Sequence, residues 1–175
     1  MQDPWHTIVD SNVAVLVASV RRIVGNDHDA EDVVQEVFAE AYRIPKTTKI
    51  ENWSALLRKM AQRRAIDQLR RRMRQANATG SDAILNIASS EIEPSESLDW
   101  QERDDQLRAA LATLADREAS AFSLAYFDGM SRPEIAVVLE ASTNAVNVAI
   151  HKAIQKLRKQ LCRKPPVSGD ANDVP

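Results

Sequence analysis

One stretch without apolar periodicity divides this sequence into two parts, and it restricts the possible folds more than any other feature. Residues 76–105 are rich in Ser, Glu, Asp and Asn, contain Pro94, and show no apolar pattern beyond Ile87. Because the whole chain has 175 residues, each side can form only a small domain with a modest core. We therefore predict two small domains, at 1–75 and 106–164, with a flexible acidic linker at 76–105 and a disordered tail at 165–175.

Three helices are predicted in the first part. Glycine and aromatic residues are scarce, at 4 glycines and 5% aromatics, and this composition favours helices over strands. Apolar residues at helical spacing predict a helix over 8–24, and Gly25 offers a stop. Asp29 can cap a second helix that ends near Tyr42, and a long third helix begins at Trp53. The expected fold class is all-α.

The second part has the pattern of a helix-turn-helix. Ser131 and Glu134 form a capping box before a short helix, and Ser142 can cap the helix that follows. In that last helix the apolar side chains turn inward and Asn, His and Lys face outward, which suits a major groove. Helices are predicted at 107–114, at 117–127 with Asp116 as cap, at 135–139, and after Ser142, where Val146, Ile150, Ala153 and Leu157 face the core.

Charge is segregated along the chain. The stretch "AQRRAIDQLRRRMRQ", residues 61–75, carries six arginines and one acid, although the net charge of the chain is −2. Acids cluster before it, at 27–40, and within 76–105. Because charges on a merely solvated helix usually alternate in sign, this concentration indicates that the helix meets an anion such as a nucleic-acid phosphate.

Several function classes lack support in the sequence. Cys162 is the only cysteine, and no CxxC motif or His/Cys cluster offers a metal site. No Ser/His/Asp set or Gly-rich phosphate loop is visible, so we expect neither an enzyme nor a cofactor. No signal peptide or membrane-spanning stretch is present, and we expect a cytoplasmic protein that does not insert into membranes.

Three segments carry a resemblance to a known family. They are "DAEDVVQEVFAEAY", "LLRKMAQRRAIDQLRRR" and "LRAALATLADREASAFSLAYFDGMSRPEIAVVLEASTNAVNVAIHKAIQKLRKQL", in that order. The chain resembles the bacterial RNA polymerase sigma factors of the extracytoplasmic-function (ECF) group, within the sigma-70 family. The first two segments resemble region 2 of these proteins, and the third resembles region 4.

The resemblance implies partners and sites. The chain would bind the largest subunits of core RNA polymerase, recognise minus-ten and minus-35 promoter elements, and send its acidic linker along the RNA path; it also allows for an anti-sigma factor as a partner. The implied polymerase contacts are Asp32, Gln35 and Glu36. The implied minus-ten contacts, from the loop at 44–53 and the basic helix, are Lys46, Thr47, Thr48, Lys49, Asn52, Trp53, Arg63, Arg64, Arg70 and Arg71. The implied minus-35 contacts are Arg132, Ser142, Asn144, Asn147, His151 and Lys152.

A few positions depart from the family pattern, and one alternative function stays open. Glu140 stands where a turn glycine is usual, and Leu56-Leu57 replaces a Trp-Leu pair. The alternative is a stand-alone helix-turn-helix regulator of the response-regulator output type. That reading requires a receiver domain or ligand pocket in the first part, and the helical pattern there indicates neither.

Overall fold

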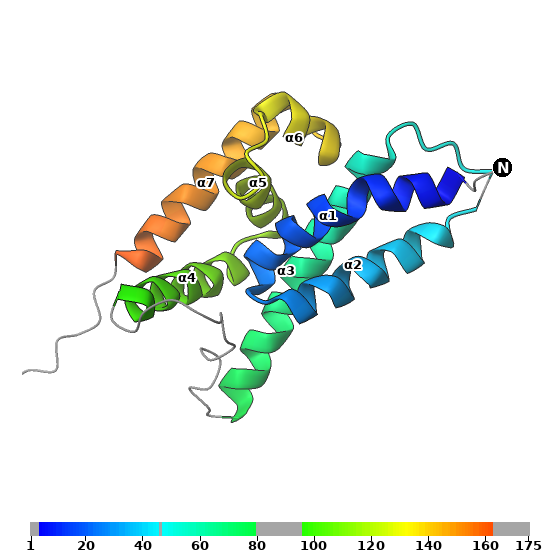
Figure 1. The fold of residues 1–175 in the computed structure, drawn as a ribbon. Helices are drawn as coiled ribbons and strands as arrows, with labels where there is room; N and C mark the ends of the chain where they lie inside the picture. The colour runs from blue at the N-terminus through cyan, green and yellow to red at the C-terminus, as the bar shows by residue number, and fades with distance from the viewer. Residues whose placement is uncertain (1–3, 46, 80–95, 163–175) are drawn as a thin grey trace, which may run out of the picture.

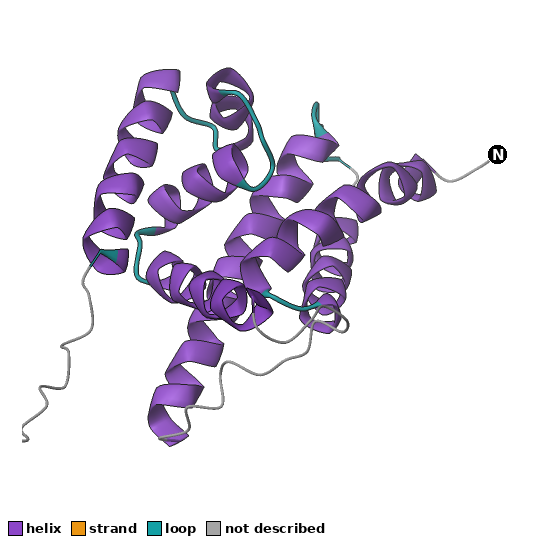
Figure 2. Ribbon diagram, turned by 60° about the vertical axis from the view of Figure 1, so that its left-hand side comes forward, coloured by secondary structure: helices purple, strands orange, loops and turns teal. Residues whose placement is uncertain are grey.

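The protein is all-α, as predicted. The structure is a computed structural model and describes residues 4–45, 47–79 and 96–162 (Figure 1). Within these ranges it contains helices and loops and no strand (Figure 2). The helices are α1 (Pro4–Val24), α2 (Asp27–Tyr42), α3 (Trp53–Thr79), α4 (Glu96–Ala112), α5 (Asp116–Tyr126), α6 (Arg132–Val138) and α7 (Thr143–Leu161).

The first part is a bundle of α1, α2 and α3. The apolar positions that predicted α2 are buried, among them Val33, Val34 and Val37. They pack against the apolar side of α3, which includes Leu57 and Ile66. Burial of these side chains, at about 1.5–3 kcal/mol each, orders α3 and turns its remaining sides outward. The packing of the bundle therefore determines which arginines of α3 are exposed and which contact other helices.

The second part contains the predicted helix-turn-helix, formed by α6 and α7. Ser142 caps α7, because its Oγ accepts a hydrogen bond from the Ala145 N–H at 3.1 Å. The Glu134 carboxylate accepts bonds from the Ser131 N–H at 2.8 Å and the Ser131 hydroxyl at 2.6 Å, and these bonds lower the pKa of Glu134. Four residues of α7 are buried as predicted, namely Val146, Ile150, Ala153 and Leu157.

Two predicted caps were wrong. The N-cap of α2 is Asn26, which has an extended backbone and accepts a bond from the Asp29 N–H at 2.8 Å. Asp29 instead lies in the first turn, where its negative charge suits the helix N-terminus. Asp116 is likewise the first residue of α5 and not its cap. Both helices begin earlier than predicted because acids are also favoured inside the first turn.

The predicted linker at 76–105 is helical at both ends. α3 continues to Thr79, and α4 begins at Glu96. In α4, Arg108 lies 3.8 Å from Asp104 and 2.9 Å from Asp105, and ion pairs at this spacing support a helix. Residues 80–95 of the linker, and the predicted tail at 165–175, lie outside the described residues.

The two parts share one apolar core. α3 contacts α4, α5 and α6 as well as α1 and α2, and α1 also contacts the residues just after α5. At the turn between α1 and α2, Gly25 has a φ of 91° and lies under the side chain of Arg108 from α4. The residues of the second part that join the core of the first are Ala110, Leu111, Leu114, Ala119, Phe122, Ala153 and Leu157.

Candidate nucleic-acid interface

The outer side of α7 carries most of the predicted minus-35 residues. Asn144, Asn147, His151 and Lys152 are all exposed, on the side opposite the buried Val146 and Ile150 of the same helix. The His151 ring lies 2.9 Å from Gln155 Nε2, one turn further along. The other two predicted residues differ: Ser142 is exposed but its hydroxyl caps the helix, and Arg132 is half-buried in α6.

Val148 was missed by the sequence analysis. It is 45% exposed and lies one turn from Asn144 and beside Asn147, so it belongs to the same outer side. An apolar side chain in this position can contact the methyl group of a thymine. The helical spacing from Asn144 was the available signal, because i and i+4 share one side of a helix.

A groove of about 430 Å³ runs between α2 and α3. Asp32, Gln35 and Glu36, the predicted polymerase contacts, are all exposed on α2. Asp32 and Glu36 line the groove on one side. Arginines of α3 line the other side, and the groove is therefore of mixed charge. The charged residues of its lining are Asp32, Glu36, Glu40, Arg63, Arg64, Asp67 and Arg71.

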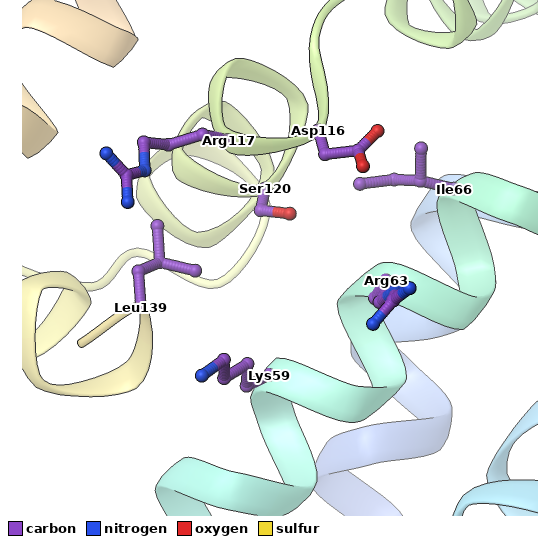
Figure 3. A pocket seen from close by; sticks show the side chains of 7 residues that line it. All are labelled: Lys59, Arg63, Ile66, Asp116, Arg117, Ser120 and Leu139. Atoms are coloured by element: carbon purple, nitrogen blue, oxygen red, sulfur yellow. The ribbon is translucent and has the colours of Figure 1, made fainter. Parts of the chain in front are cut away.

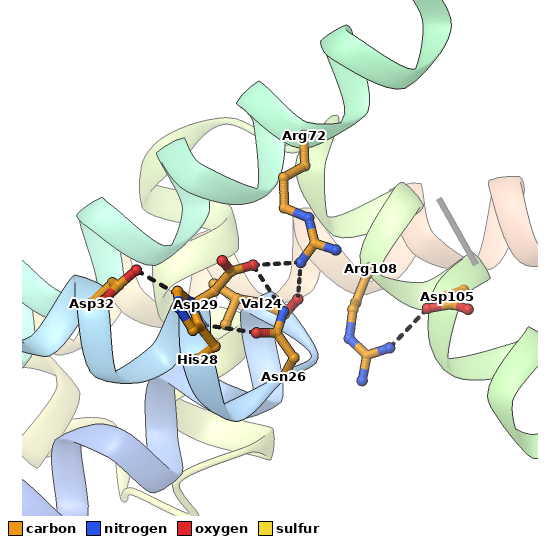
Figure 4. A network of polar contacts seen from close by, with 8 residues as sticks. All are labelled: Val24, Asn26, His28, Asp29, Asp32, Arg72, Asp105 and Arg108. Carbon is orange, nitrogen blue, oxygen red and sulfur yellow. Dashed lines mark hydrogen bonds and ion pairs between the residues drawn. The ribbon is translucent and has the colours of Figure 1, made fainter. Parts of the chain in front are cut away.

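Acids from other helices pair with several arginines of α3. Arg64 donates to Glu36 and Glu40, each at 2.6 Å, and the hydrogen bond to Glu40 is the main cause of a raised Arg64 pKa. Arg72 donates to Asp29 at 2.6 Å and to the Val24 carbonyl at 3.1 Å (Figure 4). Acidic residues are scarce within α3 itself, and the acids of the neighbouring helix α2 thus supply the negative charge that pairs with these arginines.

Arg70 is held by the second part of the chain. Its guanidinium donates to the Ala112 carbonyl at 3.0 Å, the Leu114 carbonyl at 2.7 Å and the Asp116 carboxylate at 2.5 Å. These partners lie 42 to 46 positions from Arg70 along the chain, so no local pattern in the sequence indicates them. By contrast, Arg63 and Arg71 are exposed and form no ion pair with any residue that the structure describes.

The loop before α3 is mostly exposed. Thr47, Thr48 and Lys49 are exposed, whereas Lys46 lies outside the described residues. Asn52 accepts a bond from the Ala55 N–H at 2.9 Å, so its side chain caps α3. Trp53 is half-buried and its ring lies edge-on to that of Trp5, with centroids 5.5 Å apart.

The surface between the two parts, which we call the seam, includes an open cleft. The cleft has a volume of about 150 Å³ and lies between α3 and α5 (Figure 3). Lys59 and Arg63 border it on the α3 side, and Arg117 and Ser120 border it on the α5 side. Nearby, the Lys59 ammonium lies 2.9 Å from the carboxylate of Glu140, just after α6.

Asp128 is the second residue that the sequence analysis missed. Asp128-Gly129 has the pattern of an exposed turn, and Gly129 does adopt a positive φ of 65°. The Asp128 side chain, however, is only 4% exposed and points into the seam. Burial raises its pKa, against the opposing effects of Ser19, Arg58 and Arg22. No local signal in the sequence distinguishes it from a solvated turn residue.

Two further features, a metal site and a membrane-spanning helix, are absent from the part of the chain that the structure describes. Among the described residues, no group of His, Cys, Asp and Glu side chains is arranged to hold a metal ion. No helix in the described part of the chain has the length and apolar character needed to cross a membrane. What the structure presents is an exposed helix-turn-helix, an exposed basic helix, and an acidic helix beside it.

Comparison with protein families shows what these helices are. Residues 8–75 match the family model of sigma-70 region 2, and residues 104–157 match that of sigma-70 region 4. The chain belongs to the sigma-70 family. Over 168 residues it is 27% identical to the ECF RNA polymerase sigma factor SigW of Bacillus subtilis, covering 91% of this chain and 90% of that protein. It is therefore an ECF sigma factor, and such factors act with RNA polymerase in promoter-specific transcription initiation.

Two solved structures share the fold of this sigma factor. CnrH in complex with the cytosolic domain of CnrY has a TM-score of 0.58 and 22% identity, covering 90% of this chain and 86% of that one. The sigma factor RpoE of Bartonella quintana, in complex with the anti-sigma factor NepR, has a TM-score of 0.54 and 21% identity, covering 92% of this chain and 98% of that one.

Proposed function

We propose that this ECF sigma factor docks on core RNA polymerase through α2, reads a minus-35 element with α7, and engages the minus-ten element with the loop at 44–53 and α3. The observation that carries the proposal is the outer side of α7. There Asn144, Asn147 and His151 lie together, exposed, opposite a buried apolar side. Amide and imidazole groups at successive turns suit the donor and acceptor pattern of base edges in a major groove.

We assign base recognition and phosphate binding to different side chains of the helix-turn-helix. Asn147 and His151 would contact base edges, and the exposed Val148 beside them would contact a thymine methyl group. Lys152 and Arg132 would contact phosphates, which fix the register of the helix but carry no base identity. Ser142 would act through its cap, because its hydroxyl already accepts the Ala145 N–H.

The arginines of α3 would neutralise phosphates beside the minus-ten element. Arg63 and Arg71 are exposed and available for this contact, and the exposed Thr47, Thr48 and Lys49 lie in the loop that precedes α3. Arg64 and Arg70 have acidic partners in the present arrangement. For these two, a phosphate would have to replace Glu36 and Glu40, or Asp116.

Polymerase docking is assigned to the exposed acids of α2. Asp32, Gln35 and Glu36 lie on one side of a helix whose other side is buried. A basic or polar helix of the polymerase could contact them along the groove beside α3. An anti-sigma factor is a further proposed partner, since the related RpoE of Bartonella quintana was solved with one.

A reconstituted transcription assay tests the proposal. Purified core polymerase, this chain and a pool of promoter fragments should together give discrete run-off transcripts, whereas core polymerase alone should give none. The chain alone should bind the same DNA weakly and with little sequence preference. Tight sequence-specific binding by the chain without polymerase, together with no gain in transcription, would support the stand-alone regulator instead.

A further inference from the structure

The cleft between α3 and α5 contains a hydroxyl group without a partner. Ser120 of α5 is only 7% exposed, and it borders the cleft. Its hydroxyl forms no hydrogen bond with any residue in the described part of the chain. Figure 3 shows this oxygen pointing into the space between α5 and α3. Because a buried hydroxyl without a partner is costly, a bound group that accepts its hydrogen would remove that cost.

Three cationic side chains border the same cleft. Lys59 and Arg63 lie one turn apart on the same side of α3. Arg117 lies one turn before Ser120 on α5. Arg63 and Arg117 are exposed, and neither forms an ion pair with a described residue. Lys59 has an acidic partner, Glu140, at 2.9 Å. Two helices that are distant in sequence thus bring hydrogen-bond donors to one place.

The lining of the cleft favours an anion over a cation. Asp116 is the only acid among the lining residues, and its carboxylate already accepts a hydrogen bond from Arg70 at 2.5 Å. The lining also includes the apolar side chains of Ile66 and Leu139. Because such groups keep water away from one side of the cleft, a charge pair there is screened less than on an open surface.

The volume of the cleft restricts the anion to a small group. At about 150 Å³ it holds on the order of five water molecules of about 30 Å³ each, and typical ligand pockets begin at about 300 Å³. A phosphate group fits, but a base with its sugar does not. Guanidinium groups match phosphate oxygens in pairs. The first turn of α5, with Asp116 and Arg117, borders the cleft, and the dipole of this 11-residue helix adds to the attraction.

We propose that the cleft is a binding site for a small phosphorylated molecule, a phosphate monoester or a diphosphate, that bridges α3 and α5. Arg63 and Arg117 bind its oxygens from the two sides of the cleft. Ser120 donates its hydroxyl hydrogen to a further oxygen, and Lys59 adds positive charge. The free chain forms this site without polymerase or promoter, so the inference goes beyond the proposed function and does not rest on it.

A titration of the full chain with inorganic pyrophosphate tests the proposal. Binding is followed through the backbone amide signals in proton–nitrogen correlation NMR spectra, and chloride keeps the ionic strength constant. The signals of Arg63, Arg117 and Ser120 should shift together and saturate. We expect a single site per chain with a Kd below about 1 mM. Shifts spread evenly over the exposed arginines and lysines of the chain would show general charge screening and would overturn the proposal.

Two variants test whether pyrophosphate binds in the cleft. Arg117→Ala and Ser120→Ala should each raise the Kd at least about tenfold, because each removes a hydrogen bond to a charged group. Arg43→Ala removes an exposed arginine just after α2 and serves as the matched control, with an unchanged Kd. Circular dichroism verifies that all three variants keep their helices. An unchanged Kd in Arg117→Ala or in Ser120→Ala would contradict the site.

Duplex DNA of arbitrary sequence distinguishes the two sources of a phosphate group. Added without pyrophosphate, it should leave the Ser120 amide signal in place, because a continuous strand does not fit a cleft of this size. If DNA shifted that signal and pyrophosphate did not, the cleft would bind a promoter phosphate and the proposal would fail. Since no arm of the experiment uses polymerase, its result is independent of whether the chain initiates transcription.

Discussion

The guanidinium of Arg70 lies 2.5 Å from the carboxylate of Asp116, which joins the basic helix of region 2 to the first turn of α5 in region 4. The Arg70 side chain is 24% exposed, and its other donors reach two backbone carbonyls. Arg71, the next residue, is exposed and has no ion pair among the described residues. Two neighbouring arginines of one helix therefore have different environments.

Arg70→Ala and Arg71→Ala should differ in their effects on stability. Loss of Arg70 leaves two carbonyls and an acid without their donor, and should lower the free energy of unfolding by about 1–3 kcal/mol. Loss of Arg71 should change it by less than about 0.5 kcal/mol, as for most surface residues. Denaturant unfolding of both variants measures the difference. Equal stabilities would mean that the Arg70 contacts contribute nothing in solution.

Arg71 is also the cleaner test of phosphate binding. The logarithm of the binding constant of the holoenzyme for promoter DNA falls linearly with the logarithm of the salt concentration. Each lost phosphate contact should reduce the magnitude of this slope by about 0.7 to 0.9. Sequence preference should not change, because a phosphate carries no base identity. Binding measured over a range of salt concentrations, with Lys159→Ala as an exposed control on α7, gives the slope. A slope equal to that of the wild type would make Arg71 a solvated residue only.

The acids of α2 can be tested apart from DNA. Asp32→Ala with Glu36→Ala should weaken binding to core polymerase while leaving helicity intact, since both side chains are exposed. Arg64 keeps Glu40 as a partner in this variant. Asp10→Ala, an exposed acid on α1, serves as the control and should bind normally. Undiminished co-purification of the double variant with core enzyme would refute the assignment of α2.

The outer side of α7 should determine the minus-35 sequence. Asn147→Ala and His151→Ala should each change preference at particular positions, by about 1 to 3 kcal/mol for a good bidentate contact. Lys152→Ala should instead weaken binding to all promoter variants alike. Competition between a set of single-base promoter variants measures the pattern. If Asn147→Ala behaved as Lys152→Ala does, Asn147 would position the helix without reading a base.

The raised pKa of Asp128 predicts a specific pH dependence. Because burial raises the pKa in the folded state, the folded protein binds more protons than the unfolded chain between the ordinary pKa of an aspartate and the raised value. The contribution of Asp128 to stability is thus fully present below about pH 4 and is lost as the pH rises through the raised pKa.

Asp128→Asn isolates this contribution, since the amide does not titrate and its oxygen can still accept from Ser19 and Gln62. The difference in unfolding free energy between wild type and Asp128→Asn should fall as the pH rises from about 4 toward neutral, and then level off. A difference that rises with pH would show that Arg22 and Arg58 outweigh burial and that the pKa is lowered.

Local patterns in the sequence predicted the helices well. The apolar spacing of α2 and α7, the Ser142 cap and the exposure of Asp32 and Asn147 all follow from residues within one or two turns of each other. Such features depend on helical geometry, which sequence neighbours determine. The same local patterns placed two caps wrongly, because an acid is favoured both at the N-cap and in the first turn.

The seam could not be predicted, because it depends on contacts between distant residues. The arginines of α3 have almost no acid beside them in sequence, yet Asp29, Glu40 and Asp116 pair with them in space. Asp128 looks like a turn residue, and only the approach of α1 and α3 buries it. Charge segregation along a chain therefore indicates that positive charge meets an anion, but not whether that anion is DNA or another helix.

Promoter selection by the reconstituted holoenzyme is the most direct test of this sigma factor's assigned role. Core polymerase and this chain transcribe a library in which the region upstream of the start site is randomised, and the initiated molecules are sequenced. We predict two enriched blocks at a fixed separation, one near minus-ten and one near minus-35, with the minus-35 block altered by Asn147→Ala. No enrichment over core polymerase alone, or a single block that the α7 variant leaves unchanged, would contradict recognition of two elements by the two parts of this chain.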